Sequence, residues 1–275
     1  MSGLVMVSLV RAVTAAFVVV SASVLAEVLG PVWGALIISL PVASGPVYVF
    51  MVLAHETGFV AGAALNGFAA NAATGLFLIV YAMRASRRTL ARALGPAALA
   101  WIGAATAIAS VAWTPLTALL LNVAVYGTGL LLVRPAPQAP LAEGRPVARP
   151  RPVDLAIRAG AVALFVTFVL GLSFALGPAW TGVIAAYPVT LTCTFAILHR
   201  RAGGATMAQL ASLTIRGVFG FGLTLLTLHL TIEALGGALG LAVALAVSLV
   251  WSVGLLGLQR RAGARARPRS RSAGA

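Results

Sequence analysis

The stretch RAVTAAFVVVSASVLAEVLGPVWGALIISLPV, residues 11–42, returns 147 positions later as RAGAVALFVTFVLGLSFALGPAWTGVIAAYPV, residues 158–189. Twelve of the 32 aligned positions are identical, and the alignment has no gap. An apolar bias inflates matches of Leu, Val and Ala, but it does not align an Arg, a Trp, a Gly and two prolines. The alignment therefore predicts an internal duplication.

The repeated unit is too apolar for an ordinary soluble domain. Hydrophobic residues make up 61% of the chain and charged residues 9%, with a mean hydropathy of +1.04. Residues 93–133 carry no charge and as one helix would span roughly 60 Å, about twice the hydrocarbon thickness of a bilayer. That run must fold back, and Thr114-Pro115 near its middle predicts the turn. These features indicate an α-helical membrane protein, because backbone amides in lipid must be hydrogen-bonded internally.

The same length criterion predicts about nine spans in an all-α, polytopic integral membrane protein. They lie near 5–28, 32–54, 58–83, 93–112, 115–133, 155–176, 178–199, 205–230 and 235–258. We expect residues 1–133 to form an N-terminal membrane repeat of five helices and 154–259 a C-terminal repeat of four. A Pro/Arg-rich cytoplasmic linker, 134–153, joins them, and an Arg-rich tail, 260–275, follows. Linker and tail are both predicted to be disordered, since neither has enough apolar surface to offset the entropy of folding.

The charges predict the orientation. The chain has 19 Arg, no Lys and only five acids, for a net charge of +14. Most arginines fall between or beyond the predicted spans on one side of the membrane, whereas Glu56 and Glu233 lie on the other. This positive-inside pattern predicts a cell-membrane protein with a cytoplasmic C-terminus and an external N-terminus. The expected partners are the bilayer and its anionic lipids rather than a nucleic acid.

Five spans separate the equivalent helices, and an odd number means that the second copy enters from the opposite side. We therefore expect two inverted-topology repeats. Beyond the gapless stretch the register slips, pairing His55 with His199. Transporters built this way bind substrate near the midplane between the repeats. Pro41 and Pro188 lie there, roughly 15 Å deep. We expect these kinked helices to line a substrate path with Ser44 and Thr192, although proline kinks also occur in membrane helices without a transport role.

Arg216 is the most unusual single residue, because it falls in the middle of a predicted span. An arginine at the bilayer centre costs roughly 2.5–3.5 kcal/mol and usually faces a partner or a wet cavity. It either holds an anionic substrate or gates a path with Glu27, or it is a structural residue bonded to carbonyls. Asn66 and Asn71 occupy the equivalent span of the first half and extend the candidate path.

Residue chemistry argues against an enzyme. Without lysine there is no Walker A lysine and no Schiff base. His55-Glu56 begins like a zinc-protease helix, but Phe59 stands where the second histidine would be. We expect no catalytic residue, metal or cofactor. Gly58-x-x-x-Gly62 and Gly236-x-x-x-Gly240 permit close helix approach and are compatible with a homodimer.

The stretch Gly177-Pro178-Ala179-Trp180-Thr181-Gly182, leading to Tyr187-Pro188, resembles the GlpM-like small inner-membrane proteins. The resemblance implies a bacterial inner-membrane location and nothing about substrate. Together with the repeat, it leads us to expect a small permease or secondary transporter that alternates around the level of the two prolines. The alternative is a non-transporting membrane subunit that uses its helices for assembly.

Overall fold

The structure is a computed structural model that describes residues 44–133 and 151–266, together with five isolated positions between Val10 and Ser21, and gives side chains up to Leu258. Every regular element in these ranges is an α-helix. The all-α class predicted for the chain is confirmed, and six segments are long and apolar enough to cross a membrane. The helices are α3 (Ser44–Ala54), α4 (Thr57–Ala85), α5 (Leu90–Ala109), α6 (Pro115–Leu132), α7 (Pro152–Ser173), α8 (Pro178–Ala185), α9 (Val189–Ala202) and α10 (Gly204–Ala266).

Several sequence predictions lie outside the described residues. These are most of the first predicted span with Glu27, most of the second with Pro41, the linker up to residue 150, and the tail after residue 266. The linker was expected to reach residue 153, but α7 already begins at Pro152. Proline is well suited to the first turn of a helix, where its missing amide costs no hydrogen bond.

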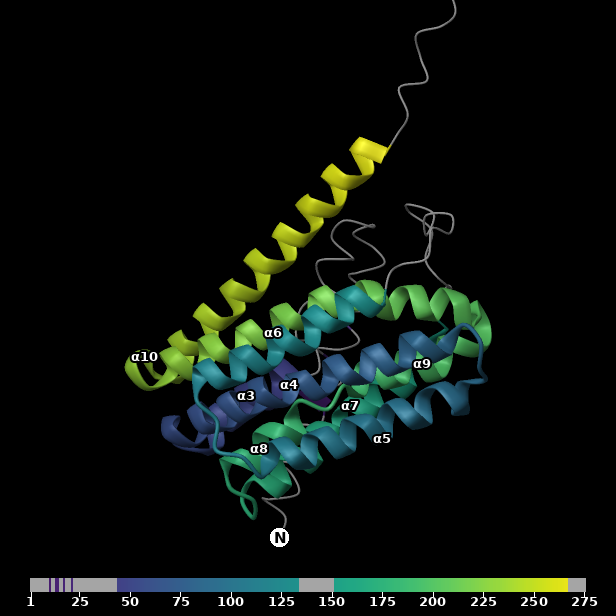
Figure 1. Cartoon of the computed structure of the whole chain (residues 1–275). Helices are drawn as coiled ribbons and strands as arrows, with labels where there is room; N and C mark the ends of the chain where they lie inside the picture. The colour runs from purple at the N-terminus through teal and green to yellow at the C-terminus, as the bar shows by residue number, and fades with distance from the viewer. Residues whose placement is uncertain are drawn as a thin grey trace, which may run out of the picture.

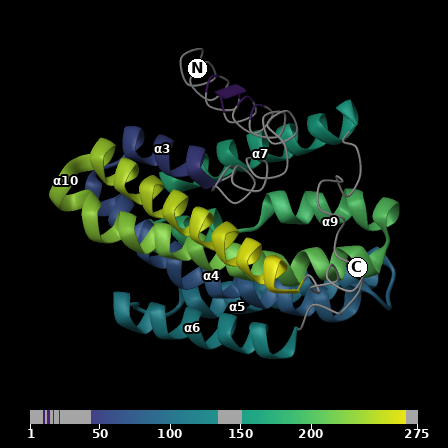
Figure 2. The same ribbon diagram turned by 90° about the horizontal axis from the view of Figure 1, so that it is seen from above.

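Helix α4 is the centre of the bundle, and α5, α6, α8 and α10 pack around it (Figures 1 and 2). Its largest interface is with the first arm of α10, residues 204–235, and the two helices run antiparallel. At one end Gly58 lies beside Glu233, at the other Ala85 lies beside Gly204, and Asn71 contacts Val218 between them. Because these contacts are spread along the whole length of α4, that helix is the scaffold on which the other elements are placed.

Helix α10 contains two arms that meet at Gly236. This glycine has φ 78°, in the left-handed region that other residues avoid, and the chain folds back there (Figure 1). A side chain at Gly240 would come within 2.9 Å of the Ile232 Cα, so the turn requires a second small residue. The second arm, 237–266, passes the predicted start of the disordered tail at residue 260. Ala and Arg are strong helix formers, which explains why the helix continues into the tail.

The turn predicted at Thr114-Pro115 connects α5 to α6. Thr114 caps α6 by accepting a hydrogen bond from the Thr117 amide at 3.2 Å, while the Thr114 amide donates to Thr117 Oγ1 at 3.0 Å. Such a reciprocal cap satisfies amides that would otherwise be unpaired at the start of a helix.

The two described glutamates and most of the described arginines lie at opposite ends of the bundle. Glu56 and Glu233 lie where α4 begins and the first arm of α10 ends; we call this end the glutamate face. The other end carries most of the described arginines, and we call it the arginine face: Arg84, Arg87, Arg88, Arg92, Arg151, Arg200 and Arg201.

Candidate functional site

A break in a membrane helix lies between α8 and α9. Pro188 has no amide hydrogen, and its φ of −81° and ψ of 61° make it the centre of a tight turn in which the Val189 amide donates to the Tyr187 carbonyl at 2.8 Å. The eight residues of α8 rise about 12 Å, so the turn lies about halfway along the candidate span Pro178–Ala202. Non-helical backbone at this depth must find hydrogen bonds within the protein.

Helix α4 supplies one of those bonds. Thr74 Oγ1 donates to the carbonyl of Ala186 at 3.0 Å and accepts from Trp101 Nε1 at 3.1 Å. The Trp101 ring packs edge-on against Tyr187, with 4.9 Å between ring centroids. Thr192, one turn into α9, donates to the Pro188 carbonyl at 2.9 Å. We call Ala186, Tyr187 and Pro188 with these three partners the α8–α9 break.

A second polar cluster, the Asn71 network, lies three residues away on α4. Asn71 Nδ2 donates to Asn122 Oδ1 at 3.2 Å and to the Val218 carbonyl at 3.1 Å. Asn122 Nδ2 donates to the carbonyls of Phe68 and Ala118, and the Tyr126 hydroxyl donates to the Asn71 carbonyl at 2.9 Å. The network therefore joins α4 to α6 and to the first arm of α10.

The Asn71 network lies at mid-depth. Asn71 is fourteen residues from each end of α4, which is about 21 Å along the helix. Asn71 and Asn122 are 1% and 0% exposed, and Asn71 Oδ1 has no hydrogen-bond partner among the described residues. The side chains that make the bonds in both clusters are amides, hydroxyls and one indole, which carry no charge at neutral pH.

The structure brings some of the predicted path residues together and separates others. Pro188 is buried, Thr192 is half-buried, and both belong to the α8–α9 break. Ser44 is the half-buried first residue of α3. Asn66 bonds only within its own helix, to the Gly62 carbonyl at 2.9 Å.

Arg216 does not point into the bundle. Its side chain is exposed, and its carbonyl accepts a hydrogen bond from Trp251 Nε1 at 3.1 Å. Arg216 is thus twelve residues along α10 on an outward face, away from Asn71 and the α8–α9 break. The role predicted for Arg216 in a central path stays a prediction.

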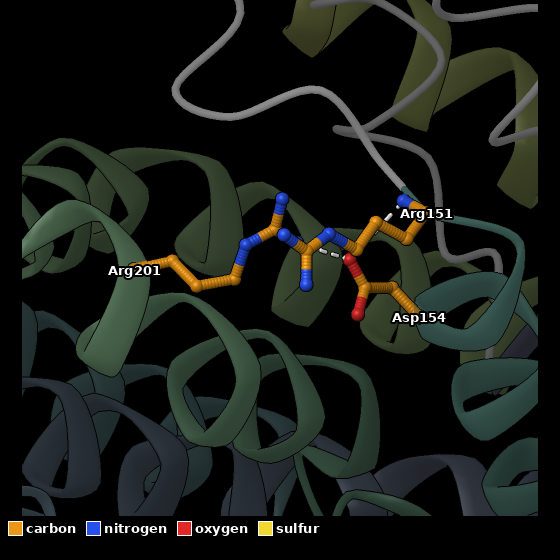
Figure 3. Close-up of polar contacts among 3 residues, drawn as sticks. All are labelled: Arg151, Asp154 and Arg201. Atoms are coloured by element: carbon orange, nitrogen blue, oxygen red, sulfur yellow. Dashed lines mark hydrogen bonds and ion pairs between the residues drawn. The ribbon is translucent and has the colours of Figure 1, made fainter.

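An ion pair ties two helices at the arginine face. Asp154 accepts hydrogen bonds from Arg201 Nη1 and from the backbone amide of Arg151, so the start of α7 is held to the last turn of α9 (Figure 3). Asp154 is 8% exposed, and its charge is therefore compensated within the protein.

Both GxxxG motifs contain a glycine that serves a close contact or a turn within the chain. A side chain at Gly62 would lie 3.1 Å from Pro178 Cβ, and Gly236 forms the turn of α10. The homodimer stays a prediction.

Comparison of the chain with protein-family models, curated proteins and solved structures gives no match. The fold itself defines the class, an all-α protein with six described segments long and apolar enough to cross a membrane. Sequence reasoning missed Trp101, Asn122 and Tyr126 as members of the polar centre. Asn122 had a usable signal, since it is the only amide in the apolar helix α6.

Proposed function

We propose that the protein is a small permease or secondary transporter with a polar path at mid-depth between two inverted halves. The observation that carries this proposal is the α8–α9 break. Irregular backbone within the hydrocarbon region is tolerated where it is buried in protein or lines a cavity, and broken helices near the midplane form substrate sites in many transporters.

The relation between α4 and the first arm of α10 supports the inverted halves. Asn71 in α4 of the first half donates to the carbonyl of Val218 in α10 of the second half, so the two helices touch at mid-length. Two antiparallel helices, one from each half, that touch near their middles are compatible with a pseudo-twofold axis in the membrane plane. Two copies with five and four spans would give the nine spans expected from the sequence.

The charge distribution supports the orientation. With the arginine face toward the cytoplasm, the positive-inside rule is obeyed and the glutamate face is external. The arginine face would then contact anionic lipids.

The chemistry of the centre favours an uncharged polar substrate over an anion. The groups at the break and in the Asn71 network are neutral donors and acceptors, whereas the only mid-span arginine of the described residues, Arg216, faces outward. Neutral amides and hydroxyls can exchange their hydrogen bonds for those of a polar solute without moving a charge into lipid.

The proposal predicts that the path is reachable from water. Thr192→Cys and Ser44→Cys, each with Cys193→Ala, are reconstituted in vesicles and treated with a membrane-impermeant thiol reagent from one side or the other. We expect labelling at both positions, because a thiol ionises and reacts only where water reaches it.

Leu164→Cys is the matched control. Leu164 lies near the middle of α7 with 74% of its surface exposed, so in a bilayer it faces lipid. It should stay unlabelled. Complete protection of both test positions from both sides would count against any transport path.

Arg216 favours a second candidate, a non-transporting membrane subunit. A partner that covers an exposed mid-span arginine removes a cost of roughly 2.5–3.5 kcal/mol. On this alternative Arg216→Ala should shift the protein from a complex to a single chain in mild detergent, and deletion of residues 260–275 should abolish function. For a transporter with a central path, Arg216→Ala should leave labelling of Thr192→Cys unchanged.

A further inference from the structure

We infer that His55 and His199 are matching latches, each of which holds one face of the path shut. The inference rests on the proposed function and adds its gates. Each histidine bonds across the two halves, and the two bonds lie at opposite ends of α4.

The first latch is at the glutamate face. His55 follows α3, and its Nε2 lies 2.7 Å from Ser173 Oγ at the end of α7. Ser173 Oγ donates its own hydrogen to the Leu170 carbonyl at 2.7 Å, so it accepts from His55 Nε2–H. The ring stacks on Phe59 at 4.1 Å and packs on Phe174 at 4.8 Å, which fixes its orientation.

The second latch is at the arginine face. His199 in α9 is 8% exposed, and its Nδ1 lies 2.7 Å from the hydroxyl of Tyr81 in α4. Its Nε2 lies 3.2 Å from the carbonyl of Arg88, which can only accept. His199 therefore donates from Nε2 and accepts the Tyr81 hydrogen at Nδ1.

The two histidines occupy matching positions in the repeat, whereas their partners Ser173 and Tyr81 do not. The helices α3 and α9, which begin at Ser44 and Val189, correspond to within one residue in the register that pairs His55 with His199. The helix α3 ends beside the start of α4, whereas α9 ends near the last turns of α4. Each short helix thus leads to a different face and is pinned there to a helix of the other half.

This placement gives the latches a mechanical role. If one half moves against the other about α4, one face can open only when its own histidine–hydroxyl bond breaks. A histidine that merely satisfied a buried hydroxyl would affect stability without favouring either face.

Two substitutions each delete one hydroxyl and keep the rest of the side chain: Ser173→Ala and Tyr81→Phe. In the Thr192→Cys, Cys193→Ala background we expect Ser173→Ala to raise the labelling rate from the glutamate face and Tyr81→Phe to raise it from the arginine face. The change should be about threefold, the population shift that one interhelical hydrogen bond supports.

A second measurement does not depend on a water path. The distance between two spin labels reports the opening of each face in the full-length protein in lipid. One pair is placed at Glu56 and Ala175 on the glutamate face, and the other at Arg87 and Arg200 on the arginine face. All four positions are exposed. Ser173→Ala should broaden or lengthen only the first distance distribution, and Tyr81→Phe only the second.

The outcomes separate the two proposals. If the spin labels move at the expected faces while Thr192→Cys stays protected throughout, the latches stand and the transport path fails. If Thr192→Cys is labelled but neither substitution changes one face selectively, the latches are overturned and the path remains.

Discussion

Gly182→Ala should force α8 away from α4 and destabilise the protein. A Cβ at this position would overlap the backbone of Ala63, with 2.9 Å to its Cα, so the two helices would have to separate. Overpacking of this kind costs about 3 kcal/mol where backbone cannot yield. The α8–α9 break would lose its support as well, because Thr74 reaches Ala186 only while α8 lies against α4.

The loss of stability should be measured as a fall in the thermal stability of the purified protein in detergent. The readout is the size of the folded peak on size exclusion. Gly103→Ala in α5 is the control, since a Cβ there meets no atom within 4 Å. Ala is the better helix former by about 1 kcal/mol, so Gly103→Ala should be neutral or stabilising. Equal stability of the two variants would show that α8 does not pack on α4 as described.

Asn122→Ala should destabilise the bundle by about 2 kcal/mol, because the change removes hydrogen bonds between helices and leaves a small cavity. Asn122 is fully buried, donates to Phe68 at 2.8 Å, and accepts from Asn71 at 3.2 Å. Without it α6 loses its polar attachment to the middle of α4. The free energy of unfolding in mixed micelles measures the effect.

Asn66→Ala is the control that tests whether loss of any amide side chain in α4 would destabilise the bundle equally. Asn66 bonds within α4 only and is half-buried, so its removal should change the free energy of unfolding by no more than about 0.5 kcal/mol. A loss as large as that of Asn122→Ala would mean that the Asn71 network has no special role.

The helical class, the turn at Thr114-Pro115 and the break at Pro188 could all be predicted from the sequence, because each depends on local chemistry. A long apolar run must be helical in lipid, and a proline in the interior of a span removes a backbone hydrogen bond and favours a break there. The ends of α4, α5 and α6 fall within three residues of the predicted spans.

The direction of Arg216 could not be predicted. In a membrane protein the core and the lipid are both apolar, so hydrophobic periodicity does not reveal which side of a helix faces inward. The partners of Asn122 and Ser173 were hidden for a different reason. They lie 51 and 118 residues away in the chain, and nothing in a single sequence pairs them.

The most direct test of the inverted arrangement is to place a tag at each end of the chain. The accessibility of each tag is then compared between intact cells and opened cells. The inverted arrangement predicts an amino-terminal tag that is reached from outside and a carboxyl-terminal tag that is reached only after the cytoplasm is opened. Tags on the same face would contradict it.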